Sequence, residues 1–295
     1  MIIDSHTHYA NFQFDREAPR LCEQNGEYAA FRASREELIE KMKSEGIVGV
    51  IEPSIELENI EKQIDLAKKH SGWMRVAVGV HPTRAIRTDW EDRKTIDSFA
   101  KHESVVAIGE TGLDYHYKRF QQHRKVQKKW FLYQLELAHR HALPLVLHIR
   151  NADRDALAIL KKHREKLHGG VAHCFTGDDK LAKKYVELGF VIGIGGKLLG
   201  NDSEAMELCR AVKYLPLESI VVETDAPLVI PKDVKKEIVS STNQWKKLSN
   251  SSLILARIIR KIAEIRGEDT DAVALAVYRN TLRAFDLEED AFFRS

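Results

Sequence analysis

The stretch SIVVETDAP at residues 219–227 is a short apolar run that ends in carboxylates. Seven similar runs precede it, each followed by a longer charged segment with helical spacing: MIID (1–4), IVGVIEPS (47–54), MRVAVGVHP (74–82), VVAIGE (105–110), LPLVLHI (143–149), GGVAHCF (169–175) and FVIGIGG (190–196). Runs that are apolar along their whole length indicate strands buried on both faces, as in a parallel sheet covered by helices. The eight strand-helix units predict an α/β fold of the (β/α)8 TIM-type barrel class rather than an open sheet.

Two amphipathic segments follow the eighth run, at 251–267 and 269–285, and predict helices that close the chain. No linker or short-period repeat interrupts the pattern. We therefore expect one domain over residues 1–295, with enlarged loops at 9–34 and 228–250.

The composition excludes several classes of protein. The chain has 46 Lys and Arg residues against 44 Asp and Glu residues, so it lacks the strongly basic balance of many nucleic-acid-binding proteins. Its three cysteines, Cys22, Cys174 and Cys209, are too few and too scattered for a disulfide framework. The N-terminus lacks the features of a signal peptide, and no run approaches the roughly 18 apolar residues of a membrane span. These features predict a soluble, cytoplasmic protein.

Ionisable side chains terminate most of the predicted strands. Active sites of such barrels lie at the carboxyl ends of the strands. His6 and His8 follow the first run, two residues apart and so on one side of an extended chain. The later runs end in His81, Glu110, His148, His173 and Asp225. A single histidine in such a place is usually structural, but burying this many ionisable groups costs several kcal/mol unless they are paired or bound to metal.

The predicted ligands are imidazoles and carboxylates without thiolates, which suits Zn, Mn, Fe or Mg. One catalytic ion typically takes three protein ligands, and this set is larger. We therefore predict two divalent ions, with Glu110 of the central fourth strand as the carboxylate that bridges them.

Six ordered blocks of sequence resemble the TatD family of metal-dependent deoxyribonucleases, within the amidohydrolase-like barrels. These blocks are DSHTH (4–8), GVHP (79–82), AIGETGLDY (107–115), LVLHIR (145–150), VAHCFTG (171–177) and VVETDAP (221–227), and the likeness extends to NTLRAFDL (280–287). The resemblance implies that His6, His8 and Asp225 bind a first ion, that His148 and His173 bind a second, and that Glu110 bridges them. Many amidohydrolase relatives have a carbamylated lysine as the bridge, and Glu110 and His148 favour the TatD branch instead.

The resemblance implies hydrolysis of phosphodiester bonds in DNA, with single strands or strand ends as substrate and Mg, Mn or Zn as cofactor. Two ions about 4 Å apart activate a bridging hydroxide and stabilise both oxygens of an in-line displacement. Asp225 and Glu110 are the predicted catalytic residues, with Asp225 also accepting a proton.

Four further residues are predicted to contact substrate: His81, Arg150, Lys197 and Asn201. Arg150 is expected to clamp a phosphate oxygen, or else to form a surface ion pair. His81 is expected to bind a phosphate or the attacking water, or else to stabilise the His-Pro turn.

The two enlarged loops depart from the family pattern. The segment 9–34 is expected to form an extended loop at the active-site mouth. The segment 228–250 carries five lysines beside an aromatic residue, which either bind a single strand or are simply solvated: Lys232, Lys235, Lys236, Lys246, Lys247 and Trp245. Partner proteins are a further expectation for these loops.

Two alternatives stay open at this point. One is a metallohydrolase that acts on a small phosphoester, lactone or amide at the same site. The other is a barrel subunit of a larger nucleic-acid-processing complex, although a scaffold does not need six metal-binding side chains.

Overall fold

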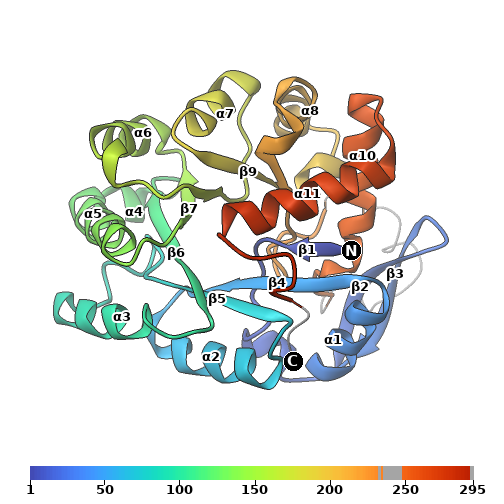
Figure 1. The fold of residues 1–295 in the computed structure, drawn as a ribbon, viewed down its shortest axis with the longest axis horizontal. Helices are drawn as coiled ribbons and strands as arrows, with labels where there is room; N and C mark the ends of the chain where they lie inside the picture. The colour runs from blue at the N-terminus through green and yellow to red at the C-terminus, as the bar shows by residue number, and fades with distance from the viewer. Residues whose placement is uncertain (232–233, 235–247, 293–295) are drawn as a thin grey trace. The chain divides into compact units, whose positions relative to one another are not determined.

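All eight predicted strands are present in the computed structural model, which describes residues 1–231, 234 and 248–292 (Figure 1). They are β1 (Ile2–Asp4), β4 (Ile47–Pro53), β5 (Met74–Val78), β6 (Val105–Asp114), β7 (Leu145–Arg150), β8 (Gly170–Ala172), β9 (Phe190–Ile194) and β10 (Ile220–Val222). The helices are α1 (Arg35–Ser44), α2 (Ile60–Lys69), α3 (Arg93–Phe99), α4 (Lys118–Gln121), α5 (Arg124–Arg140), α6 (Asp153–Lys162), α7 (Asp179–Val186), α8 (Ser203–Tyr214), α10 (Leu255–Arg266) and α11 (Thr270–Ala284). The fold is a (β/α)8 barrel with C-terminal helices α10 and α11, as predicted.

The chain divides into two compact units. Unit 1 consists of Met1–Ile51, Cys174–Lys183 and Gly193–Thr281, and unit 2 consists of Glu52–His173, Lys184–Ile192 and Leu282–Ser295. The prediction of a single domain stays a prediction.

In unit 1, β1 is flanked by two strands. It pairs in parallel with β4, where Asp4 lies opposite Val50. On its other side, the Ser5 backbone N–H donates to the Val222 carbonyl at the end of β10. These bonds place the carboxyl ends of β1 and β10 side by side.

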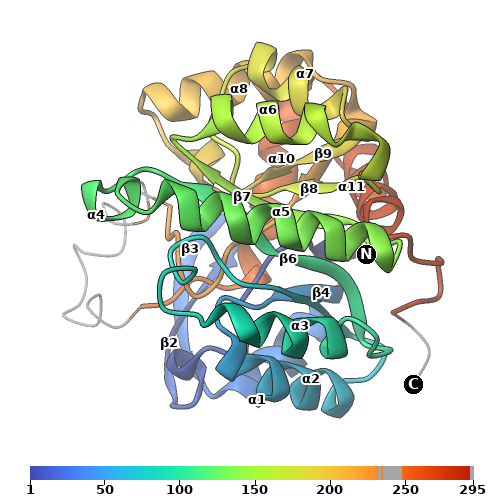
Figure 2. The ribbon, with the colours of Figure 1, turned by 90° about the vertical axis from the view of Figure 1, so that its left-hand side faces the viewer.

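In unit 2, β5 to β9 form parallel pairs in the order of the chain. Helix α5 packs along β6 (Figure 2). The central residues of the strands are buried, as Val76, Ile108 and Val146 illustrate. Burial on both faces explains why their sequences lack the alternation of a half-exposed sheet.

The segment expected as an extended loop at 9–34 contains regular structure. A 3-10 turn, η1 (Phe12–Phe14), is followed by an antiparallel hairpin of β2 (Ala18–Gln24) and β3 (Glu27–Ala33). Asn25 and Gly26 form its turn with φ of 52° and 83°. A two-residue turn with positive φ at both positions favours Asn-Gly, so this dipeptide was the available signal for the hairpin.

Replacing the turn glycine tests this reading of the hairpin. We expect Gly26→Ala to lower the free energy of unfolding by about 1–2 kcal/mol, because a Cβ is disfavoured at positive φ although no atom lies within 4 Å of its position. Asn25→Gly is the matched control and should change stability by less than about 0.5 kcal/mol. Urea denaturation measures both values, and equal stabilities of the two variants would contradict the account of the turn.

The second enlarged loop, 228–250, is described only in part. The lysines at 232, 235, 236, 246 and 247 and Trp245 lie outside the described residues. Within the ranges that the structure covers, no helix combines the length and apolar character needed to cross a membrane.

Candidate metal centre

His6, His8 and Asp225 form one cluster of possible metal ligands within unit 1, which we call the β1/β10 cluster. The Nε2 atoms of His6 and His8 are 3.1 Å apart. Asp225 Oδ1 lies 3.7 Å from His6 Nε2 and 3.2 Å from His8 Nε2. Both histidines are buried, so the two imidazoles and the carboxylate face one another with little solvent between them.

Backbone pairing brings these three side chains together. The Asp225 N–H donates to the His6 carbonyl over 2.9 Å, and the His8 N–H donates to the Ala226 carbonyl over 2.7 Å. Thr7 and Ala226 form a parallel bridge between these bonds. The spacing of two residues then projects His6 and His8 to the same side.

Glu110, His148 and His173 form a second cluster within unit 2, which we call the β6–β8 cluster. Glu110 Oε1 lies 2.7 Å from His148 Nδ1 and 3.1 Å from His173 Nε2. Glu110 and His173 are buried, and the side chain of His148 is only 17% exposed.

The strand boundaries in this cluster differ from the sequence predictions. Glu110 was expected to end its strand, but β6 continues to Asp114, and His148 also lies inside its strand rather than at its end. The register of β6 against β7 shifts between Ile108 and Thr111. Glu110 therefore sits at a bulge, a feature that redirects a side chain out of the regular alternation.

Gly109 leaves the space that this bulge requires. A Cβ at Gly109 would lie 2.7 Å from both the Cβ and the carbonyl oxygen of Val146. Its φ of 157° also disfavours a side chain. The close approach of β6 and β7 thus explains why a glycine precedes Glu110.

The β1/β10 cluster fits a divalent cation, and in unit 2 the three side chains whose ligand atoms lie close enough to share one cation are His81, Glu110 and His148. With cation-ligand distances of about 2.1 Å, two ligand atoms of one tetrahedral or octahedral site lie about 3.0–3.4 Å apart. The separations of 3.1 and 3.2 Å in the β1/β10 cluster and of 3.1 Å between Glu110 and His173 agree with that spacing. The 3.7 Å between His6 and Asp225 is longer, and the 2.7 Å between Glu110 and His148 is shorter.

The electrostatics of the β6–β8 cluster also favour a cation. Burial lowers the pKa of His148, but hydrogen bonds to Asp114 and Glu110 outweigh burial, and its pKa is raised from the ordinary value. The two carboxylates therefore make the surroundings of this ring electronegative enough to hold positive charge.

His81 lies beside the β6–β8 cluster, with its Nε2 3.4 Å from Glu110 Oε1. The backbone N–H of Thr83 donates to His81 Nδ1 over 3.1 Å. That bond places the proton of the neutral ring on Nε2, which then donates toward Glu110. His81 thus makes the turn contact that the sequence suggested and also orients the carboxylate.

The other predicted substrate residues lie outside the two clusters. Arg150 is exposed, its guanidinium lies 5.8 Å from the Tyr117 ring centre, and it has no carboxylate partner among the residues described. Lys197 Nζ lies 3.5 Å from Glu204 Oε2, and Asn201 is exposed. The surface ion pair considered for Arg150 is therefore absent from the described part of the chain.

Asp114 lies behind His148. Its Oδ2 is 3.4 Å from His148 Nε2, and its Oδ1 accepts the His116 backbone N–H over 2.8 Å. Asp114 therefore both orients a ligand and stabilises the loop after β6.

Sequence reasoning missed Asp4, a fully buried acid at the end of β1. Its carboxylate accepts hydrogen bonds of 2.6 Å from both Ser252 and Thr224. Burial raises the pKa of Asp4 to about 7, although these hydrogen bonds act to lower it. Asp4 connects β1 to the segment that carries Asp225, and its place within DSHTH was the only signal for it.

Glu223 was also missed. This buried carboxylate, two residues before Asp225, accepts the Cys174 backbone N–H over 2.5 Å. Gly193 makes room for it, because a Cβ at Gly193 would lie only 2.3 Å from Glu223 Oε2.

A pair of glycine variants tests the role of Glu223. We expect Gly193→Ala to destabilise the protein by about 3 kcal/mol, because the methyl group displaces a buried, hydrogen-bonded carboxylate. At Gly195 the nearest atom to a new Cβ is 3.5 Å away, so Gly195→Ala should change stability by less than about 1 kcal/mol. Chemical denaturation compares the two, and a tolerated Gly193→Ala would refute this packing argument.

Comparisons with known proteins identify the family of this chain. A model of the family described as TatD related DNase matches residues 3–286. A Bacillus subtilis (strain 168) protein named Uncharacterized metal-dependent hydrolase YabD is 27% identical over 285 residues, 97% of this chain and 99% of the relative. A Pantoea sp. (strain At-9b) protein named 3'-5' ssDNA/RNA exonuclease TatD is 32% identical over 257 residues, 87% of this chain and 95% of the relative.

A solved structure is similar over nearly the whole chain. The crystal structure of YjjV, a TatD homolog from Escherichia coli K12, has a TM-score of 0.78 and 27% identity, and the match covers 97% of this chain and 98% of that one. This similarity confirms the barrel fold, and the family match confirms the resemblance seen in the sequence. The chain belongs to the TatD-related DNase family and is a metal-dependent hydrolase.

Proposed function

We propose that this protein is a divalent-cation-dependent nuclease that hydrolyses phosphodiester bonds of single-stranded nucleic acid at a strand end. The observation that carries the proposal is the presence of two imidazole-carboxylate clusters, one in each unit, in a member of this family. The Pantoea relative, named as an exonuclease for single-stranded DNA and RNA, supports a polynucleotide substrate.

We propose that the protein would hold two ions, Mg, Mn or Zn, one at His6, His8 and Asp225 in unit 1 and the other at Glu110 and its neighbouring histidines in unit 2. When bound, such ions lower the pKa of water and stabilise the oxygens of an in-line displacement. Asp225 accepts the proton of the attacking water in addition to its role as ligand. His81 and Asp114 hold Glu110 and His148 in orientation through hydrogen bonds.

Three exposed or half-exposed polar residues are proposed to contact the substrate. Arg150, which has no described carboxylate partner, offers a bidentate donor for a phosphate. Lys197 and Asn201 follow β9 and offer a cation and an amide to the nucleic-acid backbone.

A substrate panel tests this function. We expect the protein loaded with Mg, Mn or Zn to release nucleotides from single-stranded DNA or RNA, and to act far more slowly on a small phosphodiester, a lactone and an amide. Nucleotide release measured by gel and by mass spectrometry decides the outcome. Faster turnover of a small ester, with no nucleotide released, would assign the site to a different class of hydrolase.

A further inference from the structure

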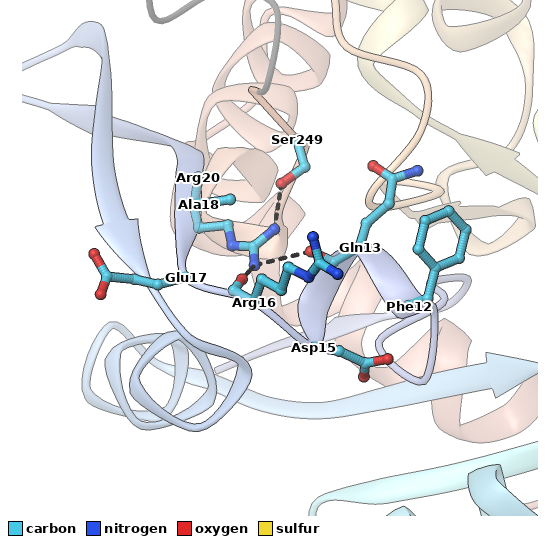
Figure 3. Close-up of a pocket in the computed structure, with 8 residues that line it drawn as sticks. All are labelled: Phe12, Gln13, Asp15, Arg16, Glu17, Ala18, Arg20 and Ser249. Atoms are coloured by element: carbon cyan, nitrogen blue, oxygen red, sulfur yellow. Dashed lines mark hydrogen bonds between the residues drawn. The ribbon is translucent and has the colours of Figure 1, made fainter.

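A polar pocket in unit 1 lies where the first enlarged loop meets Ser249. It has a volume of about 550 Å³ and is lined by Phe12, Gln13, Asp15, Arg16, Glu17, Ala18, Arg20 and Ser249 (Figure 3). This volume falls within the ~300–1,000 Å³ typical of ligand sites. We call it the hairpin pocket, because most of its residues lead into β2.

Arg20 is a fully buried cation in the wall of this pocket. It donates to the Ser249 hydroxyl over 2.7 Å and to three backbone carbonyls, those of Arg16, Gln13 and Ala33, over 2.8, 3.2 and 3.2 Å. Figure 3 shows the guanidinium directed at Ser249 and at the backbone of Gln13 and Arg16. All these acceptors are uncharged.

The bonding of Arg20 is incomplete in the part of the chain that the structure covers. A guanidinium has five N–H groups, and the four bonds use one at Nε, one at Nη1 and both at Nη2. Arg20 has no solvent-accessible surface, and its guanidinium lies 4.5 Å from the centre of the Phe14 ring. Its charge therefore attracts an anion in the pocket without touching it.

The acidic residues of the pocket do not neutralise this charge. Asp15 pairs with Arg35, and Glu17 pairs with Arg32 over 3.0 Å. Among the described residues, Arg16 and Arg20 have no carboxylate partner. The pocket therefore carries an excess of positive charge from two arginines.

An exposed aromatic ring lies among the lining residues. Phe12 is 74% exposed, more than any other exposed large apolar side chain among the described residues. Aromatic rings beside basic residues are the elements with which proteins hold single-stranded nucleic acid, the ring stacking on a base and the cations contacting phosphate.

The hairpin pocket is continuous in sequence with the β1/β10 cluster. Phe12 lies four residues beyond His8. Asn250, the neighbour of Ser249 in the chain, donates its backbone N–H to the Pro227 carbonyl over 3.0 Å. Pro227 in turn lies two residues beyond Asp225. Both walls of the pocket thus extend from the segments that carry metal ligands of unit 1.

We infer that the hairpin pocket is a subsite for single-stranded nucleic acid, which holds one nucleotide beyond the cleaved bond with its phosphate at Arg16 and its base on Phe12. The inference rests on the proposed function, because the nucleotide placed in the pocket belongs to the single-stranded substrate of that function.

Binding to metal-free protein tests the subsite without cleavage. The probe is a fluorescein-labelled oligothymidylate followed by fluorescence anisotropy in the presence of EDTA. Phe12→Ala should raise Kd about tenfold through loss of stacking. Arg16→Ala should also weaken binding and lower the slope of log affinity against log salt by about one, because one phosphate contact is lost.

The controls separate this inference from other outcomes. Lys213→Ala removes an exposed charge from the last turn of α8 and should leave Kd and the salt slope unchanged. Unchanged binding by both pocket variants would overturn the inference. Displacement of the probe by an equimolar mononucleotide would also overturn it, because the pocket would then belong to a free nucleotide.

The subsite and the proposed function can fail separately. If the wild-type protein hydrolyses single strands but the pocket variants bind normally, the subsite is wrong and the function stands. If binding depends on Phe12 and Arg16 but no nucleotide is released, the function is wrong and the subsite stands.

Discussion

We expect Glu110→Gln to lower kcat for single-strand hydrolysis by about a thousandfold. Glu110 Oε1 faces the imidazoles of His148, His173 and His81 within 3.4 Å. Glutamine keeps the size of the side chain and one oxygen acceptor but removes the negative charge that attracts cations. The loss therefore falls on cation binding and catalysis rather than on folding.

Two measurements distinguish these effects. Added Mn²⁺ should raise the Tm of the wild type, because binding stabilises the folded state, and should raise that of Glu110→Gln much less. Glu136→Gln is the matched control, since Glu136 forms a half-exposed ion pair with Lys166 at the surface, and surface pairs contribute about 0–1 kcal/mol. Wild-type turnover by Glu110→Gln would remove Glu110 from the site.

Asp225→Asn should lower kcat/KM by about a thousandfold and weaken cation affinity by about a hundredfold. Asp225 Oδ1 contacts both histidines of the β1/β10 cluster, and an amide oxygen is a weaker ligand and a far weaker base. The backbone of Asp225 has a φ of 55°, which asparagine also adopts readily. The substitution therefore tests the carboxylate with little effect on the fold.

A second aspartate provides the control for this variant. Asp286 also has a positive φ, of 51°, but it is exposed beyond the end of α11. Asp286→Asn should therefore retain wild-type activity. Calorimetric titration with Mn²⁺ and a nuclease assay compare the two variants, and equal behaviour would count against the β1/β10 cluster as a metal site.

The strands and the polar residues near their ends could be read from the sequence for one physical reason. A strand buried on both faces has to be apolar throughout, so an ionisable residue such as His173 or Asp225 stands out against its run. The same contrast indicated His6, His8 and His148. The structure brings three of these residues, His6, His8 and Asp225, close enough together to hold one ion.

The parts of the site that the sequence did not predict depend on pairing between segments that are distant in the chain. Glu110 lies at a bulge that exists only relative to β7, so its own run gave no sign that β6 continues to Asp114. Asp4 and Glu223 act through partners remote in sequence, Ser252 and Cys174. The hairpin at 18–33 was different, because its Asn-Gly turn was visible in the sequence.

Cation stoichiometry tests the central claim most directly. Metal-free protein is titrated with Mn²⁺ while bound ions per chain and release of nucleotides from single-stranded DNA are followed in the same samples. The account predicts that two ions bind per chain and that hydrolysis reaches its full rate only with the second. Full hydrolysis with one bound ion or with none would contradict it.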